Sequence, residues 1–459
     1  MNHHIFREYD IRGIADCDLP DPLVRALGLV IGARAVDGLV AVGRDCRLTS
    51  PRLFAALTDG LRVHADVIDL GVVPTPVAYF AQQQFVPDAT VMITGSHNPS
   101  QDNGFKVMIG AETLHGNAIA KLRDGVQALL KTQPQLWPRP TRAISVHDVT
   151  SAYLDRAVAA LRLGSRRPKV VVDAGNGAGG PTAVALYTRL GFDVVPLYCD
   201  FDGRFPHHHP DPTQPENLSD LINAVQHLGA ELGIALDGDA DRVGAVDATG
   251  RIMWGDQLMI LFGRAILTEV PDARFVGEVK CSQVMYDELT RAGGHVDMWK
   301  VGHSLIKERM RETGAQLAGE MSGHLFFAHR WLGFDDGIYA GARLLELLSR
   351  DDRTLAELAS ELPIAINTPE IRVDCPDDEK FDVVARVTES LRSDPVVQDV
   401  VTIDGVRARF ADGWGLVRAS NTQPAIVMRC EARDQAALSE IRKMIEAYIA
   451  AARRIPTEE

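Results

Sequence analysis

The sequence predicts an α/β protein with three similar α/β domains, whose sheets are mixed or mostly parallel, and a smaller C-terminal α+β domain. Three apolar strands that end in glycine-rich loops are expected at residues 38–45, 169–177 and 273–280. Each precedes a helical pattern and then a second apolar strand with its own loop, at residues 89–96, 232–237 and 315–320. Repeated strand–helix–strand units are typical of α/β domains with parallel strands. Ligands bind such sheets beyond the carboxyl ends of the strands, where these loops lie.

The C-terminal region from Ile371 onward differs from the three repeats. It alternates charged and apolar residues, with strands expected at 405–410 and 425–431 and a helix from about 435 to 453. This pattern predicts the smaller α+β domain. Proline and polar residues cluster at 133–140, 361–363 and 367–369, as in linkers between domains.

Composition and charge narrow the class of function. The chain has 459 residues, of which 46% are hydrophobic and 24% charged, as in ordinary globular proteins. The formal net charge of −14 argues against general binding of nucleic acid or of anionic membranes. An anionic ligand would therefore require cationic side chains to converge locally.

Targeting and redox features predict a cytoplasmic protein. No apolar run approaches the length needed to cross a bilayer, and residues 1–10 lack the apolar core of a signal peptide. The six cysteines are scattered without Cys-x-x-Cys spacing, so we expect reduced thiols rather than disulfides or a zinc site.

A loop at residues 94–99 places the hydroxyl of Ser96 directly after an apolar strand. Its sequence, Thr-Gly-Ser-His-Asn-Pro, is rich in residues that favour tight turns. Taken alone, this loop is more simply explained as a turn capped by a hydroxyl or an amide.

A second loop, after another apolar strand, sets Asp237, Asp239 and Asp241 at alternate positions. Small residues between them allow the backbone to curl so that the three carboxylates converge, and converging oxygen ligands suit Mg²⁺. An EF-hand is excluded, because the sixth position is not glycine and Ala248 stands where the closing glutamate belongs. A solvated acidic turn would leave the apolar strand that enters it unexplained.

The two loops together indicate phosphoryl transfer. A serine can carry a phosphoryl group, and an acidic triplet can hold a divalent cation beside it. Arg242 directly follows the triplet and offers its planar guanidinium to the same phosphate.

Three further loops offer polar groups for a substrate, and each has a plain structural alternative. Residues 319–324 supply a carboxylate, a hydroxyl and an imidazole suited to sugar hydroxyls, or simply a helix start capped by Ser322. Residues 418–424 combine a guanidinium, hydroxyls and backbone N–H groups into a phosphate site, or form a β-turn. Residues 9–13 give only a weak signal. The histidines at 207–209 cannot all face one ion, and we expect a solvated loop there.

Five motifs occur in the order found in the α-D-phosphohexomutase superfamily, at residues 6–13, 94–99, 237–242, 319–324 and 418–422. The chain most resembles the bacterial phosphomannomutase/phosphoglucomutase branch, nearly end to end. The resemblance implies four domains around a central cleft, which we expect at residues 1–145, 146–251, 252–364 and 365–459.

The resemblance also implies a role for each motif residue. Ser96 would be a phosphoserine and would bind Mg²⁺ together with Asp237, Asp239 and Asp241. The residues implied in catalysis are Ser96, Lys106, Arg12, His324 and Arg242. Those implied in substrate binding are Tyr9, His97, Lys280, His303, Glu320, Ser322, His324, Arg418, Ser420, Asn421 and Thr422.

Such an enzyme would interconvert hexose 1-phosphates and hexose 6-phosphates of mannose, glucose or both. Phospho-Ser96 would donate its phosphoryl group, and a hexose 1,6-bisphosphate would form, reorient and return its other phosphate to the serine. Glucose 1,6-bisphosphate would also serve as activator. Lys106 could act as the base only if its surroundings lower its pKa.

Two alternatives stay open at this stage. A phosphoglucosamine or N-acetylglucosamine-phosphate mutase is the nearer one, although Met321 matches the glucose/mannose branch, whereas the glucosamine branch typically has glutamine there. A non-catalytic phosphosugar-binding sensor is the other, although a sensor needs neither the serine nor the triplet. We expect small phosphosugars as partners, neither nucleic acid nor membrane, and a monomer or a dimer.

Overall fold

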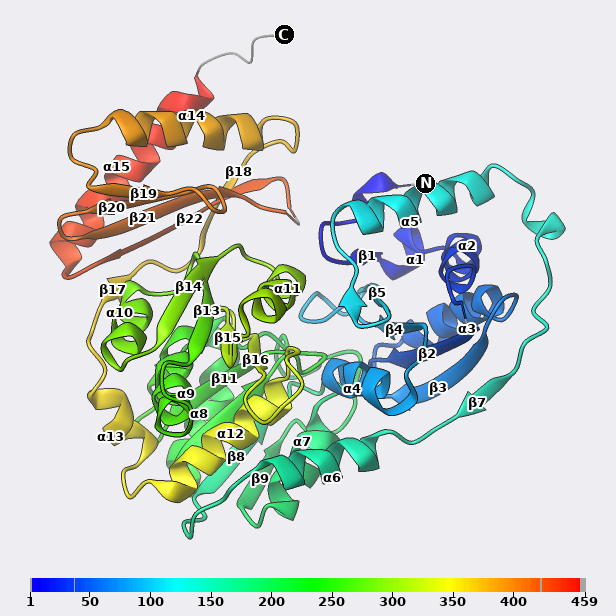
Figure 1. The fold of residues 1–459 in the computed structure, drawn as a ribbon, viewed down its shortest axis with the longest axis horizontal. Helices are drawn as coiled ribbons and strands as arrows, with labels where there is room; N and C mark the ends of the chain where they lie inside the picture. Colours follow the sequence, from blue (N-terminus) through cyan, green and yellow to red (C-terminus); the bar gives the residue numbers. More distant parts are fainter. Residues whose placement is uncertain (1, 37, 422, 455–459) are drawn as a thin grey trace.

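The protein is described by a computed structural model that covers residues 2–36, 38–421 and 423–454 (Figure 1). Within these residues the strands form four sheets, one after another along the chain. The predicted class is confirmed: three α/β units precede a smaller α+β unit. No helix in the described part of the chain has the length and apolar character of a membrane span.

The first sheet combines parallel strands with an antiparallel edge. Its order is β1-β5-β4-β2-β3-β7, with β6 beside β5, and β5 runs antiparallel to both β4 and β1. On α2, Leu23, Leu27 and Ile31 recur at helical spacing and are buried in one apolar core with residues of α3 and of the sheet. The strands are β1 Ile11–Ile14, β2 Leu39–Arg44, β3 Asp66–Val72, β4 Ala89–Ile93, β5 Asp102–Ile109, β6 Glu112–Thr113 and β7 Ile144–Val146. The helices are η1 His3–Ile5, α1 Ala15–Asp18, α2 Asp21–Gly32, α3 Ser50–Leu61, α4 Thr75–Phe85, α5 Asn117–Leu130 and η2 Pro134–Leu136.

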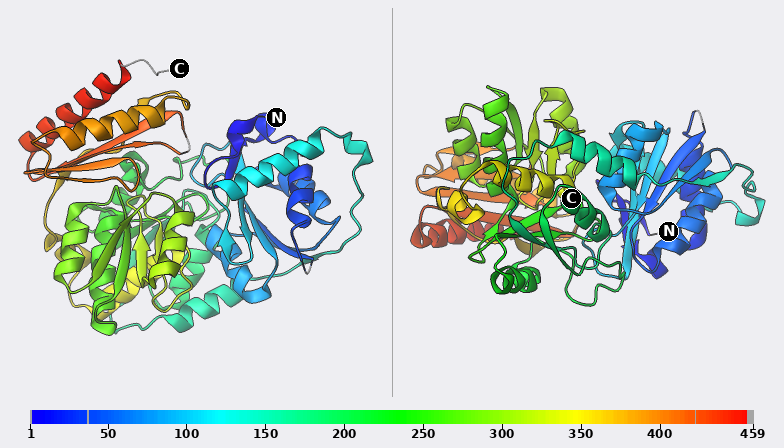
Figure 2. Two further views of the ribbon diagram at one scale, coloured as in Figure 1. Left: turned by 45° about the horizontal axis from the view of Figure 1, so that its top comes forward. Right: turned by 90° about the horizontal axis from the view of Figure 1, so that it is seen from below.

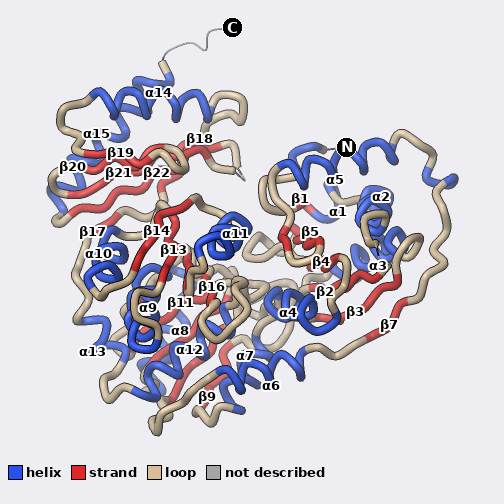
Figure 3. The backbone as a smooth tube through the Cα atoms, viewed as in Figure 1, coloured by secondary structure: helices blue, strands red, loops and turns tan. Residues whose placement is uncertain are grey.

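The second and third sheets repeat this plan with fewer strands. Their orders are β12-β11-β10-β8-β9 and β14-β13-β15-β16. The strands are β8 Lys169–Asp173, β9 Asp193–Leu197, β10 Leu232–Leu236, β11 Val243–Asp247, β12 Ile252–Met253, β13 Arg274–Glu278, β14 His295–Trp299, β15 Leu317–Gly319 and β16 Leu325–Phe327. The helices are α6 Thr150–Ala160, α7 Gly180–Arg189, η3 Pro215–Leu218, α8 Ser219–Leu228, α9 Gly255–Glu269, α10 Gln283–Arg291, α11 His303–Thr313, α12 Gly337–Arg350 and α13 Leu355–Ser360. Figure 3 shows helices flanking the strands of each unit.

The three α/β units share one hairpin in the same topological position. In each, a parallel strand of the predicted pair turns directly into an antiparallel neighbour, giving β4–β5, β10–β11 and β15–β16. The tips of these hairpins carry Ser96, the acidic triplet and residues 320–324. The predicted repeat therefore places three of the motif loops at equivalent ends of three sheets.

The last unit is an antiparallel sheet with two helices on one side (Figures 1 and 2). The sheet faces the third unit, where Trp414 and Leu416 of β21 pack against Val279. Its own apolar core, between the sheet and the helices, is separate from the core that the second and third units share with part of the first. The elements are β17 Ile366–Asn367, β18 Ile371–Asp374, α14 Lys380–Ser393, β19 Asp399–Val401, β20 Val406–Phe410, β21 Gly413–Ala419, β22 Ala425–Ala432 and α15 Gln435–Arg453.

The expectation of a solvated loop at the three histidines is wrong for most of that segment. His207 is exposed, but Pro210 and Asp211 are buried, and His208 Nε2 lies 3.0 Å from a carboxylate oxygen of Asp173. The backbone N–H of Gly238 donates to the carbonyl of Pro210 at 3.2 Å. The loop that follows the three histidines therefore packs against the acidic loop and hydrogen-bonds to its backbone.

Candidate active site

The hydroxyl of Ser96 lies beside the acidic triplet, at the tip of the β4–β5 hairpin. Ser96 Oγ donates to Asp237 Oδ2 at 3.0 Å, and His97 Nδ1 lies 3.2 Å from the same Oγ. Ser96 has a φ of 50°, in the left-handed region that non-glycine residues rarely occupy. Strained backbone of this kind persists only where surrounding contacts hold it.

The three aspartates of the triplet converge as the alternate spacing predicted. Asp237, Asp239 and Asp241 are fully buried, and one carboxylate oxygen from each lies within 4.8 Å of the others. Ala240 has a φ of 61°, which curls the loop between them. Asp239 Oδ1 is buried without a hydrogen-bond partner in the described part of the chain. Because a buried carboxylate oxygen requires compensation, this group fits a bound cation.

Lys106 on β5 supplies positive charge to the triplet. Its Nζ donates to Asp239 Oδ2 at 2.9 Å and also to Asp241. Burial disfavours the lysine charge, but Asp239 and Asp241 outweigh burial and hold the pKa of Lys106 well above its usual range. The role of Lys106 as base stays a prediction, because a cation bound to Asp239 and Asp241 would weaken the two interactions that raise this pKa.

The sugar-loop candidates form a buried chain of charges with the triplet. His324 Nδ1 lies 2.6 Å from Glu320 Oε2, and His324 Nε2 lies 3.2 Å from both Asp241 Oδ1 and Arg242 Nε. Burial lowers the pKa of His324, but Asp241 and Glu320 raise it to about 9. Burial raises the pKa of Glu320, and the bond to His324 lowers it to about 2. The His324 imidazole and the Glu320 carboxylate are therefore both charged near neutral pH. Ser322 Oγ lies 3.4 Å from Glu320 Oε2.

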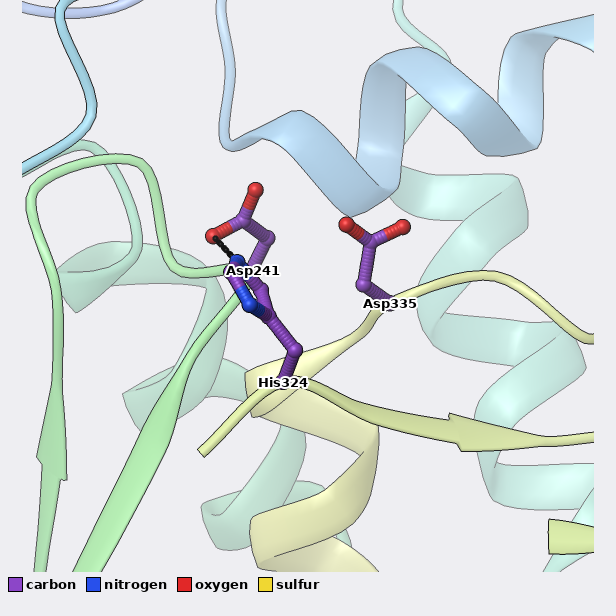
Figure 4. A group of neighbouring side chains, drawn as sticks. All are labelled: Asp241, His324 and Asp335. Atoms are coloured by element: carbon purple, nitrogen blue, oxygen red, sulfur yellow. Dashed lines mark hydrogen bonds and ion pairs between the residues drawn. The ribbon is translucent and has the colours of Figure 1, made fainter. Parts of the chain in front are cut away.

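Asp241, His324 and Asp335 form a second cluster of possible metal ligands (Figure 4). Figure 4 shows Asp241 and His324 joined by an ion pair, while Asp335 comes from the segment before α12. Lys307 Nζ donates to Asp335 Oδ1 at 3.0 Å, and His303 Nδ1 lies 3.4 Å from Asp335 Oδ2. Asp335 pairs with Lys307 as Asp239 pairs with Lys106, and its Oδ2 likewise has no hydrogen-bond partner among the described residues. We prefer the triplet as the cation site because its three carboxylates follow one curled loop directly beside Ser96.

Tyr9 connects the first, third and last units. Its hydroxyl donates to the carbonyl of Val301 at 2.6 Å and accepts from Asn421 Nδ2 at 2.5 Å. The neighbouring N–H of Gly302 donates to Glu320 Oε1 at 2.7 Å. Arg12 of the same motif donates to Asn98 Oδ1 at 2.9 Å, on the loop that carries Ser96.

The phosphate-loop candidates lie on β21 and just beyond it. Arg418 Nε donates to Asp404 Oδ2 at 3.0 Å, while Arg418 Nη2 is buried and has no hydrogen-bond partner among the described residues. A buried guanidinium with a free N–H suits an anion. Ser420 is also buried, whereas Thr422 lies outside the described residues.

Lys280 completes the positive charge around the site. Its Nζ donates to Glu370 Oε2 at 3.2 Å, and Glu278 accepts from the backbone N–H groups of both Lys280 and Met321. Five cations thus lie beside the motif loops, Arg12, Lys106, Arg242, Lys280 and Arg418, and among the described residues all of these except Arg242 form an ion pair with a carboxylate of the protein.

Comparison with known families places the whole chain. The family models for phosphoglucomutase/phosphomannomutase match its alpha/beta/alpha domain I at residues 3–131, domain II at 151–250, domain III at 254–365 and the C-terminal domain at 370–447. The chain belongs to this family.

Two relatives and one solved structure are similar to this chain over almost its whole length. A Pseudomonas putida protein named phosphomannomutase/phosphoglucomutase is 43% identical over 449 residues, which cover 97% of this chain and 95% of that one. A Pseudomonas aeruginosa protein with the same name is 44% identical, covering 95% and 94%. The crystal structure of a phosphoglucomutase/phosphomannomutase family protein from Burkholderia thailandensis has a TM-score of 0.90 at 40% identity, covering 100% of this chain and 99% of that one.

Four residues of this family member's site lie outside the sequence motifs. Thr75, at the start of α4, donates from Oγ1 to Asp239 Oδ2 at 2.6 Å. Asp404 holds Arg418, and Glu278 holds the loop around Met321. Arg47, beyond the end of β2, contacts the loop of Ser96. Strand β2 ends at Arg44 and leads into the loop with Asp45 and Arg47, but the sequence does not indicate which side chain of this loop contributes.

Proposed function

We propose that this protein interconverts hexose 1-phosphates and hexose 6-phosphates of glucose, mannose or both. The observation that carries the proposal is the 3.0 Å contact between Ser96 Oγ and Asp237 Oδ2, within a buried group of three aspartates. A hydroxyl beside an acidic metal site is the arrangement that reversible serine phosphorylation needs.

We propose that Mg²⁺ binds to Asp237, Asp239, Asp241 and the phosphorylated Ser96. The partnerless Asp239 Oδ1 and the raised pKa of Asp237, caused by burial and by its neighbouring aspartates, support a missing positive charge at this place. When bound, the ion would neutralise charge on the phosphoryl oxygens.

In each transfer, one P–O bond replaces another. In the first transfer, the bond from phosphorus to Ser96 Oγ breaks while a sugar hydroxyl oxygen bonds to phosphorus, and the hydroxyl proton passes to a base at the site. The product is a hexose 1,6-bisphosphate, which must reorient. In the return transfer, Ser96 Oγ bonds to the phosphorus of the other phosphate, the bond from that phosphorus to the sugar oxygen breaks, and the sugar oxygen takes up the proton. We assign to Arg242 and Arg12 the stabilisation of the negative oxygens of the moving group.

The remaining motif residues hold the part of the sugar phosphate that does not react. Glu320 and Ser322 bind sugar hydroxyls, with His324 and His303 beside them. Arg418 offers its free Nη2–H to the distant phosphate, together with Ser420 and Asn421. Because these contacts involve no reacting atom, they can receive either end of the bisphosphate in turn.

Glucose and mannose phosphates are the substrates that the relatives favour. The proteins named phosphomannomutase/phosphoglucomutase are 42–44% identical to this chain. By the resemblance, Met321 in the sugar loop favours the glucose/mannose branch, while an amino-sugar phosphate remains the second candidate. The six free cysteines support a cytoplasmic location.

The decisive experiment follows the phosphoryl group. Purified protein is incubated with Mg²⁺ and with glucose 1,6-bisphosphate labelled in its phosphates, and the labelled peptide is identified. We expect label on Ser96 in the natural protein and none in Ser96→Ala. Rates on glucose, mannose and glucosamine 1-phosphates then rank the sugars. Binding of phosphosugars with neither label nor turnover would instead support a phosphosugar sensor.

A further inference from the structure

The Arg47 side chain lies completely buried beneath the loop that carries Ser96. Its guanidinium donates to the carbonyl oxygens of Ser96 at 2.7 Å, Asn98 at 2.6 Å and Asp102 at 2.9 Å, and also to that of Pro99. One side chain therefore binds four peptide carbonyls of a single short loop.

Asp45 completes this arrangement from the end of β2. Its Oδ2 accepts from Arg47 Nε at 3.1 Å and from the backbone N–H of Gly95 at 3.2 Å, while its Oδ1 accepts from Ser50 Oγ at 2.6 Å. The carboxylate compensates the guanidinium charge, so the pair is neutral inside the protein. Asp45 and Arg47 together fix both the entrance of the loop and its turn.

Close packing leaves the loop little freedom to shift. A Cβ on Gly95 would lie 2.6 Å from Arg47 Cζ, and a Cβ on Gly238 would lie 2.4 Å from the carbonyl oxygen of Ser96. That carbonyl thus lies between Arg47 on one side and the acidic loop on the other. The backbone of Gly203, from the second unit, packs on Arg47 Cα in the same way.

We infer that Arg47 is a positioning residue that holds Ser96 in its left-handed conformation, with the hydroxyl directed at Asp237. Its effect on turnover rests on the proposed function, since position matters only if Ser96 transfers a phosphoryl group. Lysine cannot replace it, because one ammonium cannot reach four carbonyls that a planar fork of five donors spans. In the part of the chain that the structure describes, hydrogen bonds of the Arg47 side chain reach only Asp45 and this loop.

Two variants test the inference, with Arg44→Lys as the matched control. Arg47→Lys removes the fork, and Gly95→Ala displaces the guanidinium while keeping it. Arg44, the last residue of β2, also pairs with an aspartate: its Nη1 donates to Asp69 Oδ1 of β3 at 2.6 Å, away from the Ser96 loop. In Arg47→Lys and Gly95→Ala, kcat for glucose 1-phosphate should fall about 100-fold, because small displacements of a reacting group cost rate steeply. KM should stay within about twofold of the natural value, since sugar and phosphate contacts are unchanged.

Two further measurements separate positioning from folding. The double variant should be about as active as the poorer single variant, because both changes disturb one contact. Hydrogen exchange at the amides of residues 95–98 and 100–102 should rise in Arg47→Lys but not in Arg44→Lys, with the central strands unaffected. If Arg47→Lys does not fold, Gly95→Ala decides.

A kcat within about threefold of the natural value in the folded variants, or a change in KM alone, would overturn the inference. If the natural protein neither labels Ser96 nor turns over, the proposed function fails instead. Hydrogen exchange then still judges whether Arg47 holds the loop, and unchanged exchange would refute it.

Discussion

Asp404 offers a sharp test of how the last unit binds the substrate. Its Oδ2 accepts from Arg418 Nε at 3.0 Å within the last unit and from the backbone N–H of Val301 at 3.1 Å in the third unit. One carboxylate thus orients the phosphate-loop arginine and ties it to the loop that Tyr9 and Glu320 also hold. Replacing Asp404 by asparagine keeps the size but removes the charge.

The expected loss follows from these two hydrogen bonds. An amide oxygen accepts less strongly than a carboxylate, and the amide N–H₂ group cannot accept from Arg418 or Val301. A hydrogen bond to a charged group contributes about 1.5–3 kcal/mol, so we take a loss of about 2 kcal/mol. Since about 1.4 kcal/mol corresponds to a factor of ten, Asp404→Asn should raise KM for glucose 1-phosphate by about 30-fold. The Ser96 hydroxyl and the triplet are untouched, so kcat should change little.

Steady-state kinetics measure the effect directly. Asp412→Asn is the control, because among the described residues Asp412 forms its ion pair with the exposed Arg433, at 2.8 Å in the same unit. Its KM should equal that of the natural protein. If Asp404→Asn keeps a KM within twofold of the natural value, then Asp404 does not position Arg418 for the substrate, and our account of the interface is wrong.

Three further predictions concern the metal, the fold and pH. Thr75→Val removes the hydrogen bond to Asp239 and should raise the Mg²⁺ concentration for half-maximal activity about 10- to 100-fold. An unchanged Mg²⁺ concentration would contradict a role of Thr75 in orienting Asp239. Asp336→Ala removes the cap of α12 and the acceptor of Tyr153 and Trp331, so urea unfolding should show a loss of about 4 kcal/mol, and a loss under about 1 kcal/mol would contradict this network. Burial opposes the charge of His208, but the bond to Asp173 outweighs it and raises the pKa. The charged His208 therefore stabilises the fold fully below the pKa of about 6.5 in the unfolded chain, and this stabilisation is lost as pH rises through the higher pKa of the folded protein. His208→Gln should accordingly lower the free energy of unfolding more at about pH 6 than at about pH 9. Equal losses at the two pH values would exclude an ionic contribution.

The repeats could be predicted because their signals are local. Apolar runs that lead into glycine-containing loops mark strands such as β8 and β10, and the spacing of apolar residues marks helices such as α15. The antiparallel strands β5, β11 and β16 had no such prediction, because strand direction depends on partners and not on composition.

The site was predictable to the extent that short motifs contain it. Ser96 and the three aspartates lie in loops whose residue types already indicate their chemistry. Thr75 and Asp404 were missed because each contacts a residue that is distant in the sequence. Thr75 and Asp239 are 164 positions apart, and Asp404 and Val301 are 103 positions apart. A lone threonine or aspartate carries no local sign of such a contact.

Because the three α/β units share the same hairpin, the candidate active site is built from three separate loops. The proposed phosphoryl carrier, the proposed metal ligands and the proposed sugar contacts lie on separate hairpin tips, each anchored in its own sheet. A tip can accordingly be exchanged with that of a related protein while the other two keep their anchors. Exchanging Met321 and Ser322, while Glu320 and His324 keep their contacts with Gly302 and Asp241, is therefore a direct route to an altered sugar preference with the phosphorylation chemistry retained.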